Sequence, residues 1–309
     1  MTMVTPIEQG AAIIAELIPF ESRQSRTFLF LVFVSLFVIA GAALLAVSSL
    51  GFDAMLAGVP DDPAFWAMFG LAYAVPILAD WIIFRFTWRL PLSGIAPLLR
   101  KSIANNVLIG YAGDAYLYNW ARQKLRFQAA PFGVTKDVAV LSAMVGNGIA
   151  MSMLLATLII PSAAIHATGL AGDVVFVALV TVVLSTTFVG WLRRRIFTLP
   201  AVPCAFIAAV QVTRLLVSMV LAIYLWRFLL PTLSGSDLLR LTTLRLLVSR
   251  LPLVPCKDVV FAGATIVVIG MNPNAGTIVA MLAMLTTLAH AALGTALFVF
   301  GRCGCVRDI

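Results

Sequence analysis

The chain has 309 residues, of which 62% are hydrophobic and 11% are charged, and its mean hydropathy is +1.05. One soluble core cannot bury so much apolar surface, so the composition excludes an ordinary soluble domain and predicts an integral membrane protein. The formal net charge is +8. Because the basic residues flank apolar runs, we expect anionic lipid, and not nucleic acid, to be their counterpart.

Six apolar runs of about 20 residues, the length that crosses ~30 Å of hydrocarbon, predict six spanning helices in an all-α fold. Residues 1–27 precede them and contain an amphipathic stretch that we expect to lie at the membrane interface. The runs begin near Phe28, Ala64, Val138, Gly172, Ala201 and Gly276.

Two segments between these runs are too short to span the membrane. Pro91 to Pro131 reads as a short helix, a glycine-broken turn at GYAGD and a polar return. Pro231 to Ala275 has two short apolar pieces separated by RLPLVPCKD. Apolar segments of about 10–14 residues are typical of re-entrant structure, so we expect two re-entrant hairpins.

The distribution of Lys and Arg predicts the topology, because these residues mark cytoplasmic loops. Residues 48–63 and 161–172 contain neither, whereas the first hairpin, the Arg193 to Arg195 cluster and the tail 301–309 are basic. We therefore expect a multi-pass protein of the bacterial inner membrane with both termini in the cytoplasm. The two hairpins then enter the membrane from opposite faces.

A repeated phrase relates the two halves of the chain. WRLPLSGIAPLLR, from Trp88 to Arg100, returns as WRFLLPTLSGSDLLR, from Trp226 to Arg240. Residues 28–162 and 172–300 then align as helix, helix, hairpin and helix, and three crossings per half turn the second half upside down. Inverted-topology repeats of this kind build many transporters.

Several charged residues lie where hydrocarbon is expected. Arg214 is deep in the fifth run, where an Arg costs at least ~2.5 kcal/mol, so it either pairs with an acid such as Asp80, Asp114 or Asp258 or anchors a substrate. Asp80 can instead pair with Arg85, which follows it by one to two turns.

The second hairpin carries basic residues against the positive-inside trend. An anionic phosphate group would suit them, because the Arg fork binds two oxygens. Contact with lipid phosphates on the outer surface is the alternative reading. The residues are Arg240, Arg245, Arg250 and Lys257.

In the first hairpin, Asn105, Asn106, Gly110, Gly113 and Asp114 interrupt an apolar stretch. Glycine permits unwound backbone, Asn can satisfy freed backbone groups, and a carboxylate can pair with Arg or take a proton. An ordinary polar cytoplasmic loop is the alternative.

The first hairpin resembles the membrane domain of the lysylphosphatidylglycerol synthase and flippase superfamily. Asn106, Leu108, Gly110, Gly113 and Asp114 match its motif of Asn, Leu, Pro-Gly and Gly-Glu, with Ile109 in place of proline and Asp in place of Glu. SRLPLVPCKDVVFAG resembles the family's second proline-rich element, although Cys256-Lys257 replaces its Gly-Gly. The resemblance covers roughly residues 64–300 and implies movement or presentation of amphipathic lipids.

These observations predict a flippase-like transporter that moves or exposes an anionic phospholipid or polyprenyl-phosphate-linked substrate between leaflets. The alternatives are a membrane-embedded enzyme on such a lipid, and a non-catalytic partner of a glycosyltransferase or lipid synthase. A homo-oligomer or a lipid-modifying enzyme partner stays open. We expect no catalytic residues, metal or cofactor. The expected substrate-binding residues are Arg214, Arg250, Lys257, Arg245, Arg100, Asn106, Asp114 and Asp258.

The opposed hairpins predict that positions 93 and 236 face opposite sides of the membrane. Single cysteines replacing Ser93 and Ser236, in a variant without the native cysteines, should react with an impermeant maleimide from opposite sides of oriented vesicles. Labelling of both cysteines from one side contradicts the inverted arrangement.

Overall fold

The computed structural model describes residues 58–107, 111–124, 131–159, 197–250, 257–269 and 273–302, with isolated helical positions at 180, 183, 184 and 187. All regular structure in these ranges is helical, which confirms the all-α prediction. The interfacial segment and the spans expected from Phe28 and Gly172 lie outside the described residues.

Four long helices correspond to the apolar runs expected near Ala64, Val138, Ala201 and Gly276. Each contains a stretch that is long and apolar enough to cross a membrane, which supports a membrane protein. The helices are α4 (Pro63–Trp88), α7 (Pro131–Ile159), α9 (Ala201–Leu229) and α12 (Pro273–Arg302).

Two pairs of short helices occupy the segments expected to form hairpins. After the single 3₁₀ turn η1 (Leu92–Gly94), α5 (Ile95–Val107) packs against α6 (Ala112–Lys124). In the second half, α10 (Gly235–Arg250) packs against α11 (Lys257–Ile269). Both predicted hairpins are therefore helical pairs, and the order long, short, short, long occurs twice along the described chain.

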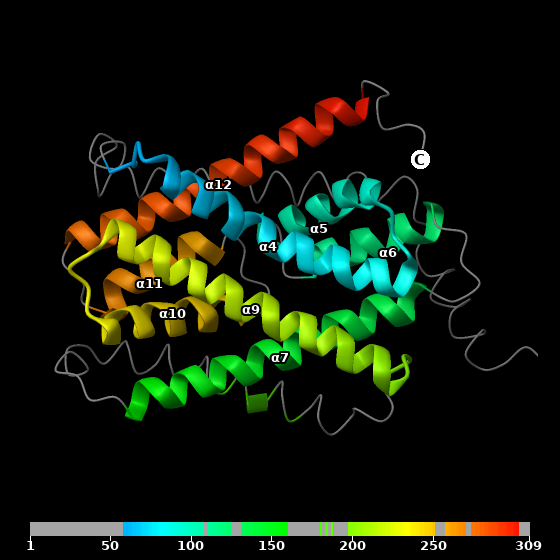
Figure 1. Ribbon diagram of the computed structural model, residues 1–309, viewed down its shortest axis with the longest axis horizontal. Coiled ribbons are helices and arrows are strands. Elements are labelled where there is room, and N and C mark those ends of the chain that lie inside the picture. Colours follow the sequence, from blue (N-terminus) through cyan, green and yellow to red (C-terminus); the bar gives the residue numbers. More distant parts are fainter. Residues whose placement is uncertain are drawn as a thin grey trace, which may run out of the picture.

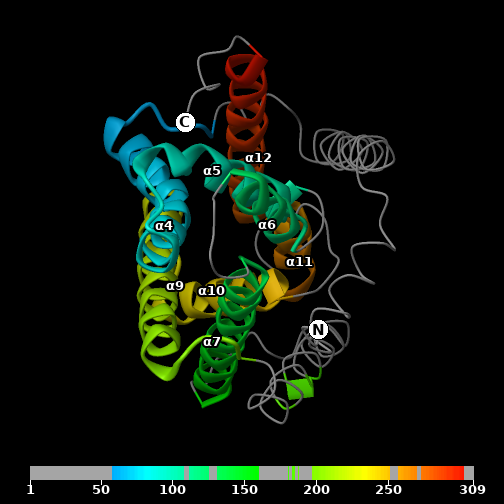
Figure 2. The same cartoon turned by 90° about the vertical axis from the view of Figure 1, so that its right-hand side faces the viewer.

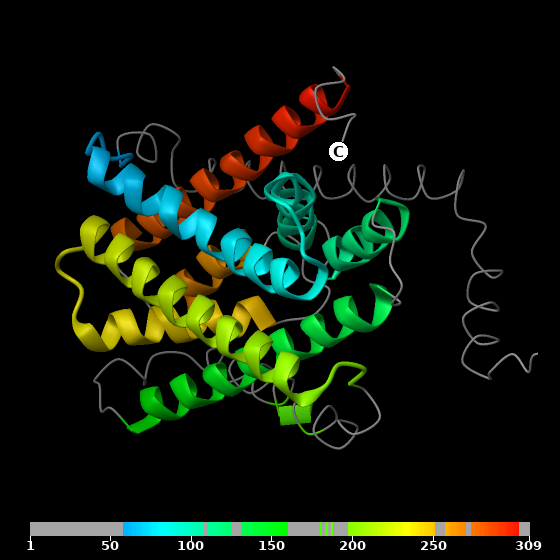
Figure 3. The ribbon, with the colours of Figure 1, turned by 45° about the vertical axis from the view of Figure 1, so that its right-hand side comes forward.

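The four long helices run in two opposite directions. Figure 1 shows α4 and α12 running one way along the long axis, and α7 and α9 running the other way. The pair α5 and α6 lies toward one end of the molecule and the pair α10 and α11 toward the other, as Figure 3 also shows. Packing crosses between the halves, since α4 contacts α9, α5 contacts α12, and α10 contacts α7.

Local sequence explains where the helices begin and end. The Asp62 carboxylate accepts the Ala64 N–H at 2.8 Å, and Pro63 occupies the first turn of α4, where its missing N–H has no cost. The helix ends at Arg89, whose φ of 53° is left-handed. In the second half, the Ser234 hydroxyl accepts the Asp237 N–H at 3.2 Å and caps α10.

Each helical pair belongs to a separate apolar cluster. Phe84, Leu98 and Leu117 are fully buried in the cluster that joins α4, α5 and α6. Trp226 and Leu241 are buried in the other cluster, which joins α9 and α10 to α11, α12 and the first turn of α4. Figure 2 shows α5 beside α12 and α10 beside α7.

Pro76 lies inside α4, between the parts of the helix that belong to the two clusters. Proline has no N–H to donate, so the Ala72 carbonyl one turn earlier lacks its usual helical partner. Ala72 and Pro76 both border the cavity described below.

Asp137 of α7 connects this helix to the start of α9. Its side chain is fully buried, and Oδ2 accepts the N–H groups of Thr198 at 2.8 Å and of Leu199 at 2.7 Å. Lys136 Nζ lies 3.3 Å from Asp137 Oδ1. A buried carboxylate that accepts two backbone N–H groups holds the entry to α9 in place.

We predict that Asp137→Ala lowers the free energy of unfolding by about 2–4 kcal/mol, because two N–H groups lose a charged acceptor in a buried position. Thermal unfolding in detergent measures the loss. Asp62→Ala is the matched control, since an exposed N-cap contributes about 1 kcal/mol. Equal losses in the two variants would show that Asp137 acts only as an ordinary cap.

Candidate functional site

A polar cavity of about 490 Å³ lies between the two helical pairs, and α4, α7 and α9 complete its wall. Polar side chains from every one of these elements border it, among them Ser142 of α7 and Thr242 of α10. Its acidic residues are Asp80 and Asp114, and its basic residues are Lys101, Arg214, Arg245, Arg250 and Lys257.

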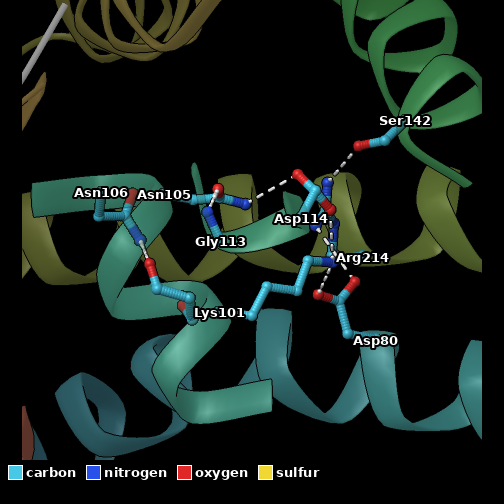
Figure 4. Close-up of polar contacts among 9 residues, drawn as sticks. Asp80, Lys101, Asn105, Asn106, Gly113, Asp114, Ser142 and Arg214 are labelled. Carbon is cyan, nitrogen blue, oxygen red and sulfur yellow. Dashed lines mark hydrogen bonds and ion pairs between the residues drawn. The ribbon is translucent and has the colours of Figure 1, made fainter. Parts of the chain in front are cut away.

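Lys101 of α5 lies at the centre of the charged network in this cavity. Its ammonium group contacts Asp80 Oδ2 at 2.7 Å and Asp114 Oδ1 at 3.2 Å, and its side chain is only 6% exposed (Figure 4). An unpaired ammonium group at this depth would carry a large desolvation cost, and the two carboxylates offset it. Lys101 thereby ties α5 to α4 and to α6.

Arg214 reaches the same network from α9. Its Nη1 is 4.0 Å from Asp80 Oδ1, and Nη2 donates to the Ser142 hydroxyl at 3.2 Å (Figure 4). The sequence offered Asp80, Asp114 and Asp258 as acidic partners of Arg214, and in the structure the partner is Asp80. Because Lys101 is much closer to Asp80, Arg214 is the more weakly held cation and keeps donors for another acceptor.

The turn between α5 and α6 is held by Asn105. Its side-chain oxygen accepts the Gly113 N–H at 2.7 Å, and its amide donates to Asp114 Oδ2 at 3.1 Å. A Cβ at Gly113 would collide with the Lys101 carbonyl oxygen, so the close approach of the helices requires glycine here. Asn106, which carried the family resemblance, instead donates to the Ser102 carbonyl of its own helix at 2.9 Å.

The second helical pair places three basic residues on the cavity. Arg245 pairs with Asp258 at 3.5 Å, and Lys257 donates to the Ser249 carbonyl at 2.8 Å. Arg250 donates from Nε to the Ser249 hydroxyl at 3.3 Å. Its guanidinium group lies against Gly146 of α7, where a Cβ would collide with it. These three residues, which the sequence analysis expected to bind substrate, therefore border one cavity.

A smaller cavity of about 220 Å³ adjoins the first and shares Asn106, Arg245 and Lys257 with it. Asp258 and His290 border the smaller cavity. His290 Nδ1 lies 2.6 Å from the Thr286 carbonyl, and its ring packs edge-on against a tyrosine of α4 with centroids 5.1 Å apart. The His290 ring is therefore positioned by the Thr286 carbonyl, one turn earlier in α12, and by the tyrosine of α4.

Two sequence expectations differ from the structure. Arg100 does not border the cavity; it donates to the Leu297 carbonyl at 3.1 Å and connects α5 to α12. Asp80 pairs with Lys101 and Arg214, whereas Arg85 donates to the Leu90 carbonyl at 3.2 Å. Lys101, the residue after Arg100, lies on the cavity instead and contacts Asp80 and Asp114.

Other residues outside the expected substrate-binding set also border the cavity. Gln211 precedes Arg214 by one turn, and its side chain is buried on the same face of α9, as is that of Trp226. Residues three or four apart lie on the same face of a helix, so the spacing of three from Gln211 to Arg214 indicates that both can border one site. The spacing of four from Lys101 to Asn105 indicates the same for α5.

In the described ranges, no cluster of three or more His, Cys, Asp and Glu side chains is arranged to hold a metal ion. Comparison of the chain with protein-family models, curated proteins and solved structures gave no match.

We predict that Lys101→Met destabilises the protein by about 3–5 kcal/mol, because Asp114 loses its cation in a buried position and Asp80 keeps only Arg214, 4.0 Å away. Adding Asp80→Asn should restore part of the loss by removing one of the two carboxylate charges. Thermal unfolding of the purified variants in detergent measures both effects. Lys124→Met, at the exposed end of α6, is the control, and an equal loss there contradicts the buried network.

Proposed function

We propose that this protein is a lipid transporter that binds an anionic phospholipid or polyprenyl-phosphate-linked headgroup in the cavity while the tails stay in the bilayer. The observation that carries the proposal is a cavity of about 490 Å³ with five basic residues on its wall, inside a bundle whose long helices are apolar enough to span a membrane. Polar groups at membrane depth typically mark a substrate pathway.

The arrangement of the helices supports alternating exposure of this cavity. In the proposal, α4 to α7 and α9 to α12 are the described parts of two inverted repeats, with further spans in residues 28–47 and from Gly172. Opposite directions of corresponding helices and crossed packing between the halves both fit such repeats. The two helical pairs then enter from opposite faces of the inner membrane, with both termini cytoplasmic.

The first helical pair also supports kinship with the lysylphosphatidylglycerol synthase and flippase superfamily. The contacts of Asn105 to Gly113 and Asp114 give a structural reason for a motif that combines Asn, Gly and an acid. Asn105, one position before the asparagine that suggested the resemblance, is the residue that makes these contacts.

The charge arrangement suggests how a headgroup would be received. An anion entering the cavity can take Arg214 from Asp80, since their closest atoms are 4.0 Å apart and Lys101 continues to compensate the carboxylate. Arg214, Arg250 and Lys257 then hold the phosphate, and Asp114 and Asp258 exchange partners as the cavity changes sides.

A transporter accounts for the site better than an enzyme does. Asp114 and Asp258, the carboxylates available as a general base, are engaged by Lys101 and Arg245. Each of these carboxylates is already engaged by a cation, whereas a general base must reach a substrate proton.

We predict that Arg214→Ala slows transfer of fluorescent phosphatidylglycerol between the leaflets of proteoliposomes by about tenfold or more, since a charge-assisted hydrogen bond is worth roughly 1.5–3 kcal/mol. Bleaching of the outer leaflet by dithionite measures the rate. Arg227→Ala changes an exposed Arg on the same helix and should leave it unchanged. Wild-type transfer by a folded Arg214→Ala variant would remove Arg214 from the mechanism.

A further inference from the structure

The charges around the cavity do not balance. Lys101 and Arg214 contact the carboxylates of Asp80 and Asp114, and Arg245 contacts that of Asp258. These three cations and three carboxylates compensate one another.

Arg250 and Lys257 remain. In the part of the chain that the structure describes, neither forms an ion pair with a carboxylate. Both border the cavity.

These two cations are held side by side. Arg250 ends α10 and Lys257 begins α11, and both donate to Ser249, one to its hydroxyl at 3.3 Å and the other to its carbonyl at 2.8 Å. The Arg250 contact uses Nε, so the terminal nitrogens have no hydrogen-bond acceptor among the described residues. Gly146 gives the guanidinium group the room it occupies.

Two adjacent positive charges that are partly buried repel each other, and they are less well solvated than they would be in water. A bound anion compensates both charges. The guanidinium fork binds two oxygens of one phosphate, and a lysine ammonium group adds a third contact as a point charge.

Two other groups on the cavity wall lack partners among the residues that the structure describes. Within those ranges, Gln211 Oε1 and Trp226 Nε1 have no hydrogen-bond partner, and both residues are only 1% exposed and border the cavity. A buried donor or acceptor without a partner costs about 1–3 kcal/mol, so such groups call for a ligand. The indole N–H can donate to a phosphate or ester oxygen, and the amide oxygen can accept from a ligand hydroxyl.

We propose that Arg250 and Lys257 form a subsite for a phosphate with two negative charges, a phosphomonoester or a diphosphate, in preference to a phosphodiester with one. A phosphomonoester carries about −1.5 to −2 at neutral pH and compensates both cations, whereas a phosphodiester leaves one of them uncompensated. This subsite deepens the proposed function, on which it rests, by naming the class of headgroup. The same chemistry would bind a lipid phosphate or a free one.

The test compares dissociation constants of the purified full chain in detergent for short-chain phosphatidic acid, short-chain phosphatidylglycerol and inorganic pyrophosphate. The wild type should bind phosphatidic acid at least about tenfold more tightly than phosphatidylglycerol, which corresponds to about 1.4 kcal/mol. Arg250→Gln and Lys257→Gln should each bring that ratio close to one. Arg240→Gln is the matched control, because Arg240 pairs with Asp237 on the same helix as Arg250.

A second pair of variants alters the subsite without changing its charge. Gly146→Ala places a methyl group where the Arg250 guanidinium lies, so it should displace that group and reduce the preference for phosphatidic acid. Gly148→Ala, two residues further along α7, has open space around its Cβ and should bind as the wild type does. Circular dichroism confirms that each variant is folded.

Equal affinity of the wild type for the two lipids overturns this subsite. It does not overturn the transport proposal, which the transfer rates of Arg214→Ala test separately. A loss of preference in Arg240→Gln as large as in Arg250→Gln also overturns it. Pyrophosphate that binds as tightly as phosphatidic acid and displaces it supports a site for a doubly charged phosphate, and counts against a lipid as its occupant. Failure of all three ligands to bind overturns both proposals.

Discussion

The described structure depends on the burial of Lys101 between the carboxylates of Asp80 and Asp114. The contact distances of 2.7 and 3.2 Å make the three groups a single charged unit shared by α5, α4 and α6. In an apolar bundle, each of these charges alone would be strongly unfavourable, whereas together they can remain at depth. On this side of the cavity, the first helical pair is therefore held to α4 by ion pairs as well as by its apolar cluster.

The opposite side of the cavity is built differently. There the cations outnumber the acids, and the helices that carry them pack through a separate apolar cluster around Trp226 and Leu241. The charges on the wall formed by the first helical pair are balanced, whereas the wall formed by the second pair carries a net positive charge. An anionic ligand is therefore attracted mainly by the basic residues of the second helical pair. Arg214 lies on α9, which borders the cavity together with both pairs.

Prolines, turn residues and apolar length are local properties of the sequence, and they identified the two segments that form helical pairs. The sequence also placed Arg214, Arg245, Arg250 and Lys257 among the expected substrate-binding residues, since a charge in an apolar run must find a polar surrounding, and all four border the cavity. Which cation lies at the centre was not predictable. Arg100 and Lys101 are adjacent on α5 and point about 100° apart around the helix, so only the packing of α5 on α4 decides which one is buried. The same applies to Asn105 and Asn106.

Pro76 gives α4 a property that its neighbours lack. The helix is anchored on one side of the proline by Phe65 in one apolar cluster, and on the other side by Phe84 in the other cluster. A missing backbone hydrogen bond at that point lowers the resistance of the helix to bending. This point lies one turn from Asp80, so bending of the helix there would shift the carboxylate that Arg214 contacts.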